Sequence, residues 1–128
     1  MPVRSPLSSY EEVTKKTLEG RELEAHVLNR AAQLLIVCRD QWNEPGHRER
    51  FEHAITYNQK LWTFFQIELV NPEHPLPKKL REDILSLSVF IHKTIFDIKV
   101  KPSTELLNAI VNINLRIAAG LQGIPVGT

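Results

Sequence analysis

Apolar residues recur every three or four positions along most of this chain, the spacing that gathers them on one face of an α-helix. Breaks at proline and glycine divide the pattern into segments with short connections, as between antiparallel helices of a bundle. No segment alternates with the period of two that is typical of a strand. The predicted helices cover, approximately, residues 9–20, 21–41, 47–69, 77–99 and 103–121. The sequence therefore predicts an all-α fold, a compact bundle of about five helices.

The ends of the chain and its length set the expected domain organisation. A chain of 128 residues is long enough for one hydrophobic core, so we expect a single helical domain over residues 1–128. Residues 1–8 and 122–128 lack apolar periodicity and are expected to be loose tails. Ser9 and Glu12 form a capping box that would start the first helix, and Gly20 would end it.

The second predicted helix has one main apolar face. On a helical wheel, its members are Leu23, Val27, Ala31, Leu34, Leu35, Cys38 and Trp42. We expect this face to pack against the rest of the bundle.

The third predicted helix has apolar residues on two opposite sides. Its core stripe comprises Phe51, Ala54, Ile55, Leu61, Trp62, Phe65 and Leu69. Asn58 lies in the middle of this stripe, and a buried amide costs free energy unless it is hydrogen-bonded. We therefore expect Asn58 to find partners across a helix interface. Tyr57, Phe64 and Ile67 lie on the opposite side of the helix.

The fourth predicted helix is also apolar on two sides, whereas the fifth has one stripe. The core side of the fourth carries Leu80, Ile84, Leu87, Ile91, Ile95 and Ile98, and its other side carries Leu85, Val89, Phe96 and Val100. The stripe of the fifth, which Ser103 would cap, comprises Leu106, Ile110, Ile113, Ile117 and Leu121. The surplus apolar residues of the third and fourth helices either fill the interior of a five-helix bundle or line an exposed groove for an amphipathic helix.

Charge does not indicate a polyanionic partner. Charged residues make up 24% of the chain and the formal net charge is +1. Acidic residues interrupt the basic ones, which are Lys78, Lys79, Arg81, Lys93, Lys99 and Lys101. Because nucleic-acid binding needs continuous positive charge, we expect these lysines and arginines to be solvated and direct nucleic-acid binding to be absent. The run Leu34–Cys38 is too short to span a membrane and no signal peptide is visible, so we expect a cytoplasmic protein.

Catalytic and metal-binding patterns are not found in the sequence. His47 and His53 are six residues apart, so they do not stack at the i,i+4 spacing of a helical metal site. There is no glycine-rich phosphate loop and no nucleophile motif. Cys38 lies within a helix stripe, where a buried inert thiol is typical. We expect no enzymatic activity, no metal and no cofactor.

A long central stretch of the chain resembles a known family. The pattern Asn58-x-x-Leu61-Trp62-Thr63 is followed, after a proline-containing link, by Leu76-Pro77-x-x-Leu80-Arg81. Further matching elements are His53-Ala54-Ile55, Ile84-Leu85-Ser86-Leu87, Ile113-Asn114 and Ile117-Ala118-x-Gly120-Leu121. In order and spacing these elements resemble the FlaF family of bacterial flagellar biosynthesis regulators, over roughly residues 10–121.

The resemblance implies a cytoplasmic, non-enzymatic protein of flagellum biogenesis that binds flagellin and supports its synthesis and export, as a chaperone would. It also implies a functional pairing with FlbT. The alternative is a post-transcriptional regulator that acts with FlbT on flagellin messenger RNA. A third possibility is an adaptor whose second apolar face forms a homodimer.

The resemblance, together with the second apolar sides of the third and fourth helices, suggests one set of partner-binding residues and one set of structural residues. The candidate partner-binding residues are Tyr57, Leu61, Trp62, Phe64, Phe65, Ile67, Leu85 and Val89. Asn58, Arg81 and Asn114 are expected to be structural hydrogen-bonding residues, because polar groups in or beside an apolar stripe commonly fix the register of packed helices.

Overall fold

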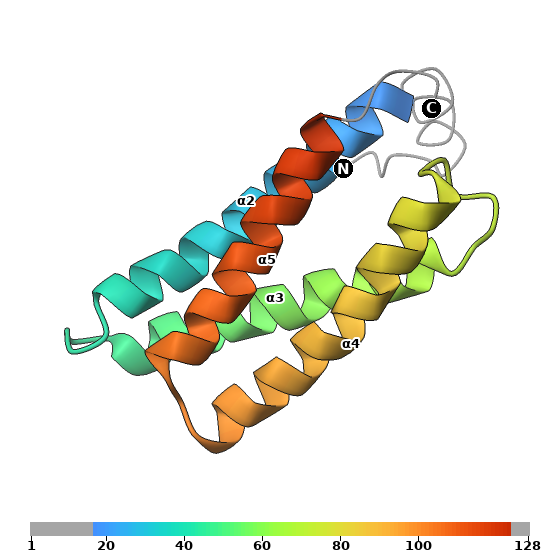
Figure 1. Ribbon diagram of the computed structural model, residues 1–128. Coiled ribbons are helices and arrows are strands. Elements are labelled where there is room, and N and C mark those ends of the chain that lie inside the picture. Colours follow the sequence, from blue (N-terminus) through green and yellow to red (C-terminus); the bar gives the residue numbers. More distant parts are fainter. Residues whose placement is uncertain (1–16, 124–128) are drawn as a thin grey trace, which may run out of the picture.

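The computed structural model in Figure 1 describes residues 17–123 of the chain. Within them, α-helices follow one another and no strand occurs: α2 spans Thr17–Asp40, α3 His47–Leu69, α4 Lys78–Val100 and α5 Thr104–Gln122. The predicted all-α bundle is confirmed, and its second to fifth helices lie close to their expected bounds.

Some expectations concern residues outside this range. The first predicted helix up to residue 16, with its capping box at Ser9 and Glu12, and the tail over residues 1–8 lie outside the described residues, as do residues 124–128. At the other end, Gln122 is the last residue of α5, and the backbone N–H of Gly123 bonds to the carbonyl of Ala119. These two residues therefore belong to the helix and its cap rather than to a tail.

The predicted helix end at Gly20 is wrong. Gly20 lies inside α2, which is already helical at Thr17, the first described residue. A glycine within a helix costs only about 1 kcal/mol relative to alanine, so it does not stop a helix that tertiary packing stabilises. A Cβ added at Gly20 would meet no heavy atom within 4 Å, so no close backbone approach requires glycine there.

The described helices pack as neighbours in a ring, in the order α2, α3, α4 and α5. α2 lies along α5, its most extensive partner, and also packs on α3; α4 packs on α3 and less extensively on α5 (Figure 1). α2 and α4, which are diagonal in the ring, do not contact each other. α4 is the least extensively packed of these helices.

The core lies between these helices, and on α2 it differs from the predicted stripe. The buried positions of α2 include Ala25, Leu28, Ala32 and Leu35, whereas Leu23 is 64% exposed. The prediction of Leu23 as a core residue is wrong. The helical wheel placed the buried face of α2 at its larger apolar side chains. In the structure the buried face is instead rich in alanine, because small side chains allow α5 and α3 to approach α2 closely.

A buried polar network joins three of the helices. The side-chain amide of Asn58 donates to the carbonyls of Ala31 on α2 (3.1 Å) and Ala54 on α3 (2.8 Å). Its oxygen accepts from Asn114 Nδ2 on α5 (2.7 Å), and Asn114 Oδ1 accepts from Trp62 Nε1 (2.9 Å). The Asn58, Trp62 and Asn114 side chains are fully buried. Every hydrogen of the Asn58 amide group is used, so the network offsets the cost of burying these polar groups.

Arginine side chains fasten the connections between helices. Arg50 donates to the carbonyls of Pro45 (2.7 Å), Gln41 (2.9 Å) and Glu44 (3.0 Å), and so closes the turn between α2 and α3. Gly46 in that turn has a φ of 83°, a conformation that favours glycine. Arg81 of α4 donates to the carbonyl of Asn71 (2.7 Å), beyond the end of α3. We regard both arginines as structural.

The helix-capping prediction at Ser103 is confirmed. Its side-chain oxygen accepts from the backbone N–H groups of Glu105 (3.2 Å) and Leu106 (3.4 Å). These bonds satisfy donors at the start of α5 that have no partner within the helix.

The polar network predicts the effect of changing its central residue. Asn58→Ala and Asn58→Leu should each lower the free energy of unfolding by about 1–3 kcal/mol, because Asn114 then lacks its acceptor and Asn58→Ala also leaves a cavity. Urea titration measures the change. Asn112→Ala, at an exposed position of α5, is the matched control and should be nearly neutral. Neutral effects of both Asn58 variants would show that the network does not stabilise the fold.

Candidate functional site

The structure divides the candidate partner-binding residues between core and surface. Phe64 is 51% exposed, and Ile67 and Val89 are each 65% exposed, whereas Tyr57, Leu61 and Leu85 are partly buried. Filling the bundle interior is therefore not the role of Phe64, Ile67 or Val89. Trp62 is fully buried and Phe65 nearly so. The assignment of Trp62 to a partner-facing surface is wrong, since its ring packs within the core and its N–H bonds to Asn114.

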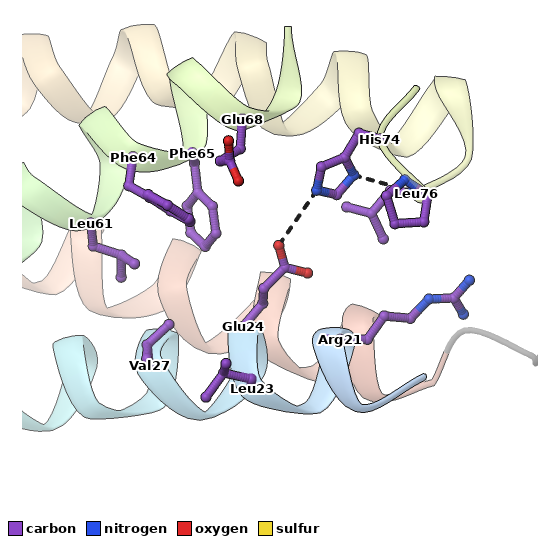
Figure 2. Close-up of a pocket in the computed structure, with 12 residues that line it drawn as sticks. Arg21, Leu23, Glu24, Val27, Leu61, Phe64, Phe65, Glu68, His74 and Leu76 are labelled. Atoms are coloured by element: carbon purple, nitrogen blue, oxygen red, sulfur yellow. Dashed lines mark hydrogen bonds and ion pairs between the residues drawn. The ribbon is translucent and has the colours of Figure 1, made fainter. Parts of the chain in front are cut away.

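A pocket lies between the N-terminal half of α2, the C-terminal half of α3 and the loop that leads to α4 (Figure 2). Its volume is about 430 Å³, within the range of small ligand pockets. The apolar part of its wall comprises Leu23, Val27, Leu61, Phe64 and Phe65. The polar residues that line it are Arg21, Glu24, Glu68 and His74. We call this feature the α2–α3 pocket.

The aromatic rings of Phe64 and Phe65 form one wall of the α2–α3 pocket. The Phe65 ring packs edge to face on Trp62, with ring centroids 5.5 Å apart, and Phe64 lies beside Phe65 at 6.2 Å. Phe64 and Phe65 point from α3 toward the side chains of α2 (Figure 2). Because Phe65 is backed by the core, the half-exposed ring of Phe64 rests on a rigid support. The apolar wall is thus preformed.

The loop between α3 and α4 closes one end of the pocket. The backbone N–H of Leu76 donates to His74 Nδ1 (3.2 Å), and His74 Nε2 lies 3.7 Å from Glu24 Oε2 on α2. Since Nδ1 accepts a bond, the proton of a neutral His74 ring is on Nε2, facing the carboxylate. Both side chains are mostly buried. This contact ties the loop to α2 and holds the polar end of the pocket in place.

A second carboxylate lies near this polar end. Glu68 is exposed on α3, and its side chain points into the end where Glu24 meets His74 (Figure 2). The pocket therefore combines an apolar wall with acidic groups at one end. Arg21, which is largely buried, contributes a cation to the same lining.

Part of this site was not found by reasoning from the sequence. Leu23 and Val27 were assigned to the core of α2, and no role was predicted for His74. The second apolar side of the third predicted helix was identified, but its exposure was left open and the helix that faces it was not predicted. Leu85 and Val89 belong to α4 and are not among the residues that line the α2–α3 pocket. The candidate set therefore does not form one surface.

Comparison with known proteins gave one result. The family model described as flagellar protein FlaF matches residues 6–121, most of the chain. No curated protein and no solved structure matched the chain significantly.

The described residues offer little reactive chemistry. Over residues 17–123, no cluster of three or more His, Cys, Asp or Glu side chains could hold a metal ion. No helix in this range is long and apolar enough to cross a membrane. Cys38 is fully buried, and this burial raises the pKa of its thiol above the ordinary value, although Arg50 acts in the opposite direction. The thiol is therefore protonated at neutral pH and closed to solvent.

The burial of Cys38 predicts slow reaction with thiol reagents. At about pH 8, the native protein should react at least about 100-fold more slowly than the urea-unfolded protein, because the raised pKa lowers the thiolate fraction and access requires opening of the fold. The release of a chromophoric disulfide reagent measures both rates. Equal rates in the two states would contradict the burial of Cys38.

Proposed function

This chain belongs to the FlaF family of flagellar proteins, and from that premise we propose that it is a non-enzymatic cytoplasmic protein that binds flagellin. In this proposal it supports flagellin synthesis and export as a chaperone does, in functional association with FlbT. The observation that carries the proposal is the α2–α3 pocket, an apolar concavity with exposed Leu23 and Phe64 at its edges.

The shape and chemistry of the pocket suit an amphipathic helix. Flagellin's terminal segments are amphipathic and are disordered before assembly, so they have an apolar face to bury when they become ordered. A helix binds a groove through apolar side chains spaced three, four and seven residues apart. Leu23 and Val27 of α2 stand opposite Leu61, Phe64 and Phe65 of α3, so a helix could place such side chains between the two rows.

The exposed side of α3 extends this surface. Phe64 and Ile67 also line a shallow hollow with Thr63 and Lys60, next to the α2–α3 pocket. Tyr57 lies about two turns before Phe64 and nearly three before Ile67, on the same side of the helix. We include Tyr57, Phe64 and Ile67 in the proposed flagellin-binding surface because bound helices commonly contact more than one pocket.

The acidic end of the pocket suggests the chemistry of the bound segment. Glu24 and Glu68 contribute two carboxylates, while only Glu24 lies close to His74. A lysine or arginine beside the apolar face of the bound helix would pair with Glu68. Such pairing at the edge of an interface acts mainly on orientation and association rate.

Phe64 provides the first test of the proposed surface. Phe64→Ala should leave the melting temperature nearly unchanged, because half of the side chain is exposed, and should weaken flagellin binding by about 2 kcal/mol, as the loss of a central aromatic contact does. Calorimetric titration with flagellin and a thermal melt of one preparation measure both effects. Val89→Ala, exposed on α4, is the control and should bind normally. A stable Phe64→Ala protein with wild-type affinity would contradict the proposal.

Glu68 provides an independent test of the acidic end. Glu68→Lys should weaken flagellin binding by about 1 kcal/mol and reduce its salt dependence, with Glu68→Gln between the variant and the wild type. Glu52→Lys, an exposed change elsewhere on α3, controls for net charge. If Glu68→Lys and Glu52→Lys have equal effects while Phe64→Ala still weakens binding, flagellin contacts the apolar wall without the acidic end.

A further inference from the structure

The outer side of α4 carries a second apolar surface, distinct from the α2–α3 pocket. Val89, Phe96 and Val100 are 65%, 66% and 71% exposed, and Leu85 is partly buried beside them. On a helical wheel these four residues fall within roughly 60° of one another. They form a stripe about 22 Å long, given a rise of ~1.5 Å per residue. We call it the α4 stripe.

No described helix covers the α4 stripe. The residues that α4 buries against the bundle lie on its other side and include Ile84, Ile91, Ile95 and Ile98. α4 contacts α3 and α5 but not α2 (Figure 1). Within residues 17–123, Val89, Phe96 and Val100 therefore face outward, whereas Leu85 packs at the margin of the core. Isolated exposed apolar residues are ordinary, but a continuous row on one helix face is typical of an interaction surface.

The spacing of the α4 stripe is symmetric. Its apolar members are separated by four, seven and four residues, so the row reads the same from either end about a centre between His92 and Lys93. A second copy related by a two-fold axis at this centre would run antiparallel. In that arrangement Val89 of each copy meets Phe96 of the other, and Leu85 meets Val100. This self-complementarity is what a two-fold, isologous interface requires.

Charge at the two ends of the stripe favours the same arrangement. Glu82 is exposed near the N-terminal end of α4, and Lys101 is exposed just after its C-terminal end. The antiparallel register that pairs the apolar residues places Glu82 opposite Ser103 of the second copy, two residues from Lys101, so the long lysine side chain can reach the carboxylate. A parallel arrangement would place like charges together and align the helix dipoles unfavourably.

The shape of the surface supports this register. A hollow of about 440 Å³ lies at the C-terminal end of the stripe, lined by Phe96, Val100 and Leu106 among others. The antiparallel arrangement brings Leu85 of the second copy to this hollow. Lys93 is exposed at the margin of the row, halfway along its length. A lysine at the centre of an apolar seam specifies the register of paired helices while lowering their stability.

We propose that the protein forms a two-fold symmetric dimer through antiparallel packing of α4 on α4 of a second copy. The stripe offers roughly a few hundred Å² per copy, less than the ~800 Å² per partner of a standard interface. The dimer is accordingly weak and concentration-dependent. It leaves the α2–α3 pocket of each copy open, so one dimer presents two flagellin-binding surfaces.

Sedimentation equilibrium of the full chain, from micromolar to millimolar concentration, tests the dimer. The wild type should dimerise, and Phe96→Glu and Val89→Glu should each weaken dimerisation by about tenfold or more. Ile67→Glu, at an equally exposed site on α3, should have no effect. Circular dichroism verifies that each variant is folded. A wild type that stays monomeric, or a Phe96→Glu protein that dimerises as well as the wild type, overturns the proposal.

Two further variants test the antiparallel register. Glu82→Lys and Lys101→Glu should each weaken the dimer, and the double variant should restore it, because the pair is then reversed as a whole. Lys93→Leu should strengthen dimerisation by about tenfold, since it removes the central charge from an apolar seam. If the double variant is no tighter than the single ones, or if Lys93→Leu weakens the dimer, the register is wrong.

A flagellin titration separates this inference from the proposed function. Phe96→Glu should bind flagellin as the wild type does, whereas Phe64→Ala should not. If the wild type is monomeric and Phe96→Glu loses flagellin binding, then the α4 stripe is a flagellin surface and the dimer proposal fails. If dimerisation behaves as expected but Phe64→Ala binds flagellin normally, the dimer stands and the proposed flagellin site fails.

Discussion

The buried hydrogen bonds of Asn58 are the constraint on which the rest of this structure depends. One amide side chain reaches the backbone of α2, the backbone of its own helix α3 and the side chain of Asn114 on α5. Apolar packing alone tolerates small rotations of a helix, because many side chains fill a core about equally well. A network of buried polar groups does not, since each unmade bond costs free energy without compensation. The rotation of α3 within the bundle is therefore narrowly determined.

This rotation has a direct consequence for the surface. With Asn58, Trp62 and Phe65 turned into the core, Phe64 and Ile67 must face outward, because they lie on the other side of the same helix. The Phe64 ring packs on Phe65, which in turn packs on the buried Trp62. The polar network and the apolar wall of the α2–α3 pocket are thus two faces of one helix, and the interior of the protein positions its proposed binding surface.

The bundle exposes apolar side chains on two separate surfaces, and this arrangement fits the partner binding that we propose for this member of the FlaF family. The α2–α3 pocket is concave, has acidic groups at one end and is braced by the contact between His74 and Glu24. The α4 stripe is a symmetric row on the least extensively packed of the described helices. The first has the features of a site for a foreign helix, and the second those of a self-complementary contact. Cys38, by contrast, is enclosed in the core, and we assign it no role beyond packing.

The sequence by itself determined the fold class, the positions of α3, α4 and α5, the capping of α5 by Ser103 and the location of Asn58 within a core stripe. These features follow from local periodicity and from proline and glycine, which act over one or two turns of chain. It also showed that the third and fourth helices have two apolar sides, because that property is visible on a helical wheel. Only the tertiary structure decided that α2 buries its alanines and exposes Leu23, that α2 faces the outer side of α3, and that Leu85 and Val89 belong to a different surface from Phe64. The physical reason is that periodicity defines the faces of a helix, whereas the choice of the face that is buried depends on how closely its neighbours can approach.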